Sequence, residues 1–125
     1  MSESVNVVLV GHCTPDAYAL KNAVRRAAPH ARIVMANSDE QLAGLAVPGA
    51  LLLVNRALDG EFRAEDGVAL IAGLASPRPA AMLISNFPDA QAAAVAAGAL
   101  PGFGKKEMGA AAVAEKIAAA LTRAK

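Results

Sequence analysis

Four places in the chain carry side chains that could act as nucleophiles, bind metals or bind anions. His12 and Cys13 are adjacent, and Asp16 follows them within one helical turn. An imidazole and a thiolate can both bind a metal, a thiolate can also respond to redox state, and a carboxylate can hold a cation. The other polar residues that could join such a site lie further along the chain: Asn55 and Arg56, Ser85 and Asn86, and Lys105 and Lys106.

Composition limits the functions that these residues could serve. The chain has 125 residues, of which 55% are hydrophobic and 18% charged, with a net charge of +1. We therefore expect one folded domain over residues 1–125 and no disordered chain. Nucleic-acid binding is not expected, because the chain lacks a basic excess and only 3% of its residues are aromatic. The single cysteine excludes an intramolecular disulfide framework or a zinc site built from several cysteines.

Targeting and membrane signals are also weak. Residues 1–11 lack the basic segment and the long apolar run of a signal peptide. No apolar stretch approaches the roughly 18 to 20 residues that a membrane-spanning helix needs. We therefore expect a cytoplasmic protein with no membrane partner.

Apolar runs alternate along the chain with amphipathic segments. The runs predict strands at residues 5–10, 31–36, 50–55, 80–85 and 102–104. The segments between and after them predict helices at residues 14–28, 38–45, 65–75, 88–98 and 110–124. Thr14 is the expected N-cap of the first helix, and Ser38 with Gln41 fits a capping box for the second.

This alternation predicts an α/β fold in which helices cover both faces of a parallel sheet. Right-handed crossovers favour a three-layer α/β/α sandwich with five parallel strands in the order 2-1-3-4-5. Ligands of such folds bind outside the carboxyl ends of the strands, near the first and third strands. Because the polar residues named above either end a predicted strand or come after one, we expect them to meet at that edge.

The whole chain resembles the receiver domain of response regulators, the chemotaxis-type module with flavodoxin-like topology. The similarity is clearest in the last third, where residues 96–99 read Ala-Ala-Gly-Ala and Gly102-Phe103 precedes two lysines. Counting along this pattern places the family's lysine at Lys105 or at Lys106. Ser85 matches the hydroxyl residue that ends the family's fourth strand.

The chain departs from the receiver pattern where receivers do their chemistry. Receivers carry two acidic residues after the first strand to bind Mg²⁺, and here residues 11–13 read Gly-His-Cys. Asn55, followed by Arg56, stands where receivers have the aspartate that accepts phosphate. An amide is no carboxylate nucleophile, and Mg²⁺ would lack its usual oxygen ligands. We therefore expect no bound Mg²⁺, no cofactor and no phosphoacceptor function.

Each candidate residue near the first helix also has a purely structural interpretation. Cys13 could be a small buried residue and His12 a residue of a surface loop. Asp16 could simply favour the first turn of a helix, and either lysine could pair with Glu107.

The residues of the central and last strands have similar alternatives. Asn55 and Arg56 could bind an anion or could hydrogen-bond to loop backbone. Ser85 with Lys105 or Lys106 could still hold an oxyanion. A flavin or nucleotide module is less favoured, because the chain has no glycine fingerprint for phosphate and few aromatic residues.

Two hypotheses for function follow. The first is a non-enzymatic pseudo-receiver that signals by contact with a protein partner, including another copy of itself. The alanines at 92, 93, 96 and 97 would allow such close helix approach. The second is a protein that responds to redox state, a metal or a small ligand through His12 and Cys13, the only reading in which a metal or chromophore is expected.

Overall fold

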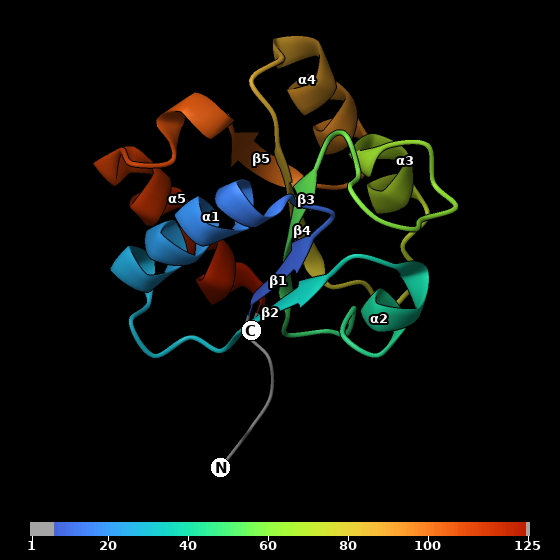
Figure 1. Ribbon diagram of the computed structural model, residues 1–125, viewed down its shortest axis with the longest axis horizontal. Coiled ribbons are helices and arrows are strands. Elements are labelled where there is room, and N and C mark those ends of the chain that lie inside the picture. The colour runs from blue at the N-terminus through green and yellow to red at the C-terminus, as the bar shows by residue number, and fades with distance from the viewer. Residues whose placement is uncertain (1–6, 125) are drawn as a thin grey trace.

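The computed structural model describes residues 7–124, in which strands and helices alternate along the chain (Figure 1). The strands are β1 (Val7–Val10), β2 (Ile33–Ala36), β3 (Leu51–Asn55), β4 (Ala80–Ile84) and β5 (Leu100–Phe103). The helices are α1 (Thr14–Ala27), α2 (Asp39–Ala43), α3 (Gly67–Ala72), α4 (Pro88–Ala96) and α5 (Ala111–Ala124), with a 3-10 turn, η1, at Lys105–Glu107. The strands form one parallel sheet in the order β2-β1-β3-β4-β5, which confirms the predicted fold class and topology.

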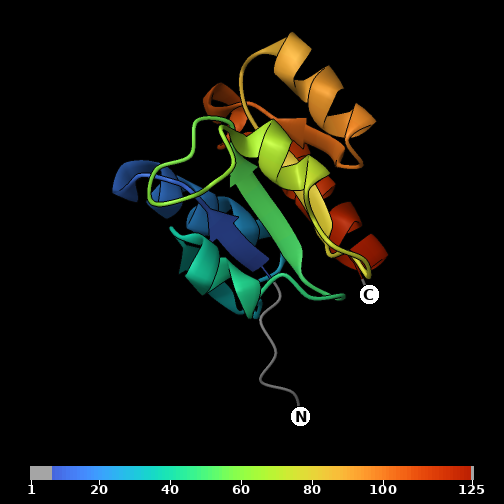
Figure 2. The same cartoon turned by 90° about the vertical axis from the view of Figure 1, so that its right-hand side faces the viewer.

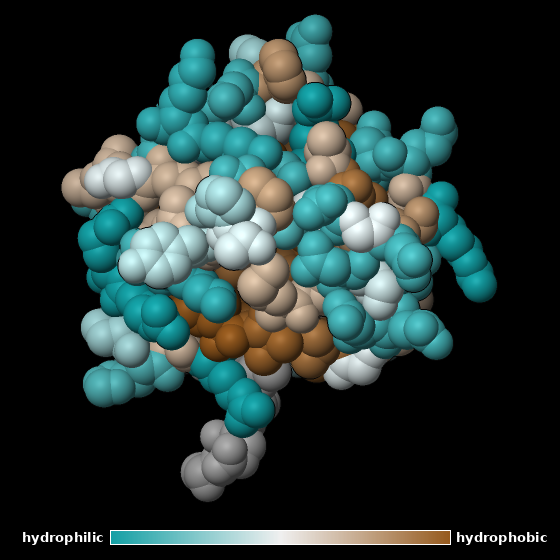
Figure 3. Space-filling model, in the orientation of Figure 1, coloured by the Kyte–Doolittle hydropathy of each residue, from teal (hydrophilic) through white to brown (hydrophobic). Residues whose placement is uncertain are grey.

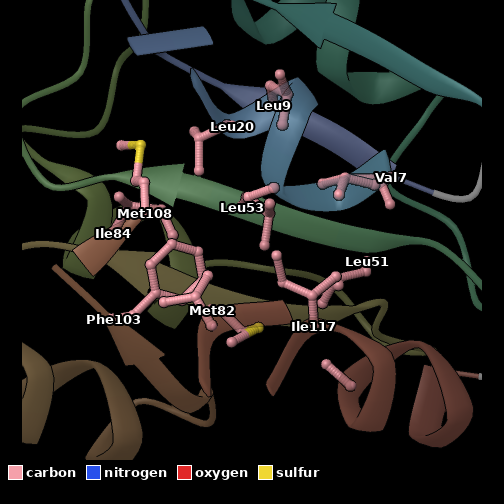
Figure 4. Close-up of a cluster of buried hydrophobic side chains, with 14 of the residues drawn as sticks. Val7, Leu9, Leu20, Leu51, Leu53, Met82, Ile84, Phe103, Met108 and Ile117 are labelled. Carbon is pink, nitrogen blue, oxygen red and sulfur yellow. The ribbon is translucent and has the colours of Figure 1, made fainter. Parts of the chain in front are cut away.

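Helices cover both faces of this sheet. Figure 2 shows α2 and α3 in front of the strands, with α1 and α5 behind them. Alternate residues along each strand point to opposite faces, so β3 sends Leu51 and Leu53 to one core and Leu52 and Val54 to the other. On the α1 and α5 side, Leu53 lies among the buried side chains of Figure 4. The central strands are buried on both faces, which explains why their sequences are continuous apolar runs.

Several element boundaries differ from the prediction. The N-cap of α1 is Cys13, not Thr14, because Thr14 already has helical geometry. The third helix is much shorter than residues 65–75, since Asp66 lies in extended backbone and its carboxylate accepts from the Ala69 N–H. The fifth strand begins at Leu100 and ends at Phe103, before Gly104. The Ser38 cap is confirmed, with its hydroxyl accepting from the Gln41 N–H.

One sequence prediction reaches residues outside the described part of the chain. The first strand was expected to begin at residue 5, and residues 1–6 and 125 are not described. Within residues 7–124, no helix is both long enough and apolar enough to cross a membrane.

Candidate functional site at the carboxyl edge of the sheet

Gly11 directly follows β1 and has a backbone conformation that suits glycine. Its φ of +72° lies in the left-handed region, and a Cβ there would stand 2.7 Å from Leu58 Cδ2. The Asp59 N–H donates to the Gly11 carbonyl, which ties the loop after β3 over this residue. An acidic side chain at position 11 would therefore meet both strain and a clash.

His12 is a buried residue, contrary to its interpretation as a surface loop residue. Only 1% of it is exposed, and its Nε2 lies 2.8 Å from the Leu53 carbonyl oxygen. A carbonyl can only accept, so Nε2 carries the proton and Nδ1 holds a lone pair. Nδ1 is buried without a hydrogen-bond partner among the described residues. Burial lowers the pKa of His12 to about 4, although the Leu53 hydrogen bond opposes this, so the ring is neutral at pH 7.

Cys13 is exposed, which corrects the interpretation of Cys13 as a small buried residue. The burial of these two neighbours is the reverse of the expectation. His12 is buried against the Leu53 carbonyl, whereas Cys13, the N-cap residue of α1, lies at the surface. The thiol hydrogen-bonds to the carboxylate of Asp16.

Asp16 and Lys105 form an ion pair across the edge of the sheet. Lys105 Nζ lies 2.8 Å from Asp16 Oδ2, and both side chains are about one-third exposed. The ion pair, followed by the Cys13 contact, lowers the pKa of Asp16 against the opposing effect of burial. The expected pairing of a lysine with Glu107 is wrong for Lys105, because Glu107 turns back to accept from the Gly104 N–H.

Asn55 ties the ends of two central strands together. Its Nδ2 donates to the Gly11 carbonyl at 2.9 Å and to the Ala57 carbonyl at 2.7 Å. The residue is 5% exposed, so both amide hydrogens are used in a nearly dry environment. The structural interpretation of Asn55, hydrogen bonding to loop backbone, is thus the one that the geometry supports.

A hollow of about 160 Å³ lies beside Asn55. Its walls include Arg56 and Lys105 as cations and Ser85 as a buried hydroxyl. The Ser85 Oγ accepts from the Phe87 N–H at 3.1 Å, and the Arg56 guanidinium stacks 4.8 Å from the centroid of the Phe87 ring. The hollow is therefore small, polar and positively lined.

Lys105 and Lys106 point to different places. Lys105 lines the hollow beside Asn55, whereas Lys106 is exposed and lines a neighbouring depression next to Gly102. The Lys106 backbone N–H donates to Asn86 Oδ1, which fixes the turn after β5 against the end of β4. Of the two lysines that the resemblance offers, Lys105 is the one that lines the hollow beside Asn55.

Two polar residues at this edge were not singled out from the sequence. Gln91 on α4 donates through Nε2 to the carbonyls of Leu83, Ser85 and Phe103 and accepts from the Gly102 N–H. Asn37, just after β2, donates to the carbonyls of His12 and Asp59. The rule that ligands bind at strand ends would have found Asn37, whereas Gln91 gives no signal in a helix of alanines.

The site residues expected from the sequence therefore gather at one edge, with Lys106 set apart from the others. Among residues 7–124, no three His, Cys, Asp or Glu side chains lie close enough together to hold a metal ion.

Comparison with solved structures identifies the architecture. The chain is similar to the crystal structure of the signal receiver domain of the DNA-binding response regulator protein merR from Colwellia psychrerythraea 34H. The two share 18% identity over 82% of this chain and 87% of that chain, with a TM-score of 0.60. The chain has the receiver-domain fold. Neither a model of a known protein family nor a curated protein matches it. The edge that carries Asn55 and Lys105 is thus the carboxyl edge of a receiver fold.

Proposed function

We propose that this protein is a receiver-like regulatory protein that acts by contact with other proteins and not by phosphorylation of an aspartate. The observation that carries the proposal is the hydrogen bonding of Asn55. The resemblance to receivers puts Asn55 at the position of the phosphoacceptor, and here both amide hydrogens bind backbone carbonyls. The amide serves as a brace between two strands, a role that a carboxylate cannot fill because it has no hydrogen to donate.

The surroundings of Asn55 support the same proposal. Gly11, His12 and Cys13 stand where receivers have their Mg²⁺ ligands, and none of them offers a side-chain oxygen. Lys105, at the position of the lysine that contacts the phosphoryl group in receivers, is already paired with Asp16. At all three positions the residues of this chain take part in contacts within the protein.

Contact with a protein partner is supported by the exposed aromatic residues near this edge. Tyr18 on α1 is 69% exposed and Phe87 after β4 is 56% exposed. Tyrosine and phenylalanine are enriched in protein-binding surfaces relative to the rest of the protein surface.

Treatment with acetyl phosphate and Mg²⁺ tests the proposal directly. We expect the intact mass of the wild-type protein, measured at neutral pH, to show no added phosphoryl group. A phosphorylatable receiver treated in the same way serves as the positive control. A stable adduct on any carboxylate of this chain, Asp16 included, would overturn the proposal.

The second candidate function uses the first loop. The buried lone pair of His12 Nδ1 has no partner among the described residues, and the adjacent Cys13 thiol is exposed. A soft metal or a redox group at these two residues would make the protein a sensor. Native mass spectrometry and an absorbance spectrum, taken with and without added Zn²⁺, compare wild type with Cys13→Ser. A metal or visible band that only wild type shows would favour this function over the first, and identical spectra without either would remove it.

A further inference from the structure

The strand β2 forms one outer edge of the sheet, and half of its backbone groups point away from the protein. The Val7 N–H donates to Arg32 O, and the Gly11 N–H donates to Ala36 O. Peptide groups alternate in direction along a strand, so residues 32, 34 and 36 face β1. Ile33 and Met35 therefore turn their N–H and C=O groups outward, and no other strand of the described chain pairs with that side.

The side chains of this edge are apolar and half-exposed. Ile33, Val34 and Met35 each keep part of their surface in contact with water. Figure 3 shows strongly hydrophobic residues gathered along the lower edge of this face, where Figure 1 places β2. Edge strands of monomeric proteins are usually protected by a charge, a proline, a bulge, a cover of helix or loop, or a very short length. β2 is short, with four residues. The strand Ile33–Ala36 contains no charged residue and no proline, and its pairing with β1 is regular.

The pattern of outward groups is complementary to itself. If two copies of β2 run antiparallel about an axis at Val34, Ile33 of each copy lies opposite Met35 of the other. These are the residues whose N–H and C=O groups point outward, so each opposed pair exchanges two hydrogen bonds. A twofold interface requires this kind of self-complementarity, because one surface must fit a second copy of itself.

The charges at the two ends of β2 favour the same arrangement. The exposed cation Arg32 precedes the strand, and the exposed acidic residues Asp39 and Glu40 follow it. Antiparallel pairing brings the basic end of one copy to the acidic end of the other. Parallel pairing would place like charges together, which is unfavourable.

We propose that β2 is the interface of a homodimer, in which two copies pair this strand antiparallel about a twofold axis at Val34. The two sheets then form one continuous sheet across both protomers. The residues that line the hollow beside Asn55 take no part in this interface, so the inference does not depend on the proposed function.

A disulfide at the axis tests the register. In this arrangement the two Val34 residues face each other as a non-hydrogen-bonded pair with Cα atoms about 4.5 Å apart, within the range of a disulfide. We expect Val34→Cys in a Cys13→Ser background to form a covalent dimer on mild oxidation. Arg32→Cys in the same background is the control, because the register puts its two copies about 14 Å apart. Equal cross-linking of both variants, or none with Val34→Cys, would overturn the register.

Light scattering over a range of protein concentrations tests the dimer without a cross-link. The Ile33 N–H points away from β1, so Ile33→Pro removes an interface donor and no hydrogen bond within the protomer. We expect a dimer for wild type and at least a tenfold weaker dimer for Ile33→Pro. Ile33→Thr, which keeps the N–H, should remain closer to wild type. Circular dichroism checks that each variant is folded. A wild-type monomer at all concentrations, or a dimer that Ile33→Pro leaves unchanged, would contradict the proposal, and the cross-linking result stands if Ile33→Pro does not fold.

Discussion

Lowering the pH from 7 to 4 is expected to reduce the free energy of unfolding by about 3 kcal/mol through His12 alone. The pKa of His12 falls to about 4 in the folded protein from an ordinary value of 6.5, chiefly because the ring is buried. Each unit of pKa difference corresponds to about 1.4 kcal/mol. The folded state binds fewer protons than the unfolded state between these two values, so acid favours unfolding. The stabilisation is complete above pH 6.5 and is lost as the pH falls toward 4.

Urea unfolding at several pH values measures this effect, and His12→Gln is the matched control. The amide nitrogen of glutamine can donate to the Leu53 carbonyl in place of Nε2, but glutamine does not titrate. We expect the variant to lose most of the pH dependence between 4 and 6.5. The lowered pKa of Asp16 has the same sign but acts below its ordinary value of 3.8, outside this window. Equal slopes for wild type and His12→Gln would show that His12 does not cause the acid sensitivity.

Asn55→Asp, which introduces the residue type that the resemblance leads us to expect at this position, should destabilise the protein by about 2–4 kcal/mol at pH 7. The substitution replaces two donated hydrogen bonds by a buried carboxylate that faces the carbonyl oxygens of Gly11 and Ala57. Burial and these carbonyls should raise the pKa of the new carboxyl group. The difference in unfolding free energy between Asn55→Asp and wild type should therefore become smaller as the pH falls, because the protonated carboxyl group has a hydrogen to donate.

Chemical denaturation of Asn55→Asp and wild type at matched pH values measures the loss. Asn22→Asp makes the same change at an exposed position of α1 and should shift the unfolding free energy by less than about 0.5 kcal/mol.

We also expect Asn55→Asp to gain no phosphoryl group from acetyl phosphate and Mg²⁺, because Gly11 and His12 still supply no oxygen ligand. Unchanged stability would refute the bracing role of Asn55, and a phosphoryl adduct would show that the missing aspartate was the only barrier to receiver chemistry.

The sequence by itself determined the fold and the edge that carries the site. Continuous apolar runs such as residues 51–54 are compatible with a strand buried on both faces, and Ser38 with Gln41 identified the start of α2. These signals are local, since they depend on residues close together in the chain. The order of the strands then followed from general rules of handedness, and strand ends placed the candidate residues together.

Only the tertiary structure decided which candidate does what. Whether His12 or Cys13 is buried depends on how the chain turns over β3, because the Leu53 carbonyl that binds the ring is 41 residues away. Lys105 pairs with Asp16 at the start of α1 and not with the nearby Glu107. The Glu107 carboxylate instead accepts from the Gly104 N–H. The brace made by Asn55 likewise joins two strands that are distant in sequence. Hydrogen bonds and ion pairs of this kind depend on distances of a few ångströms between remote segments, which spacing along the chain does not encode.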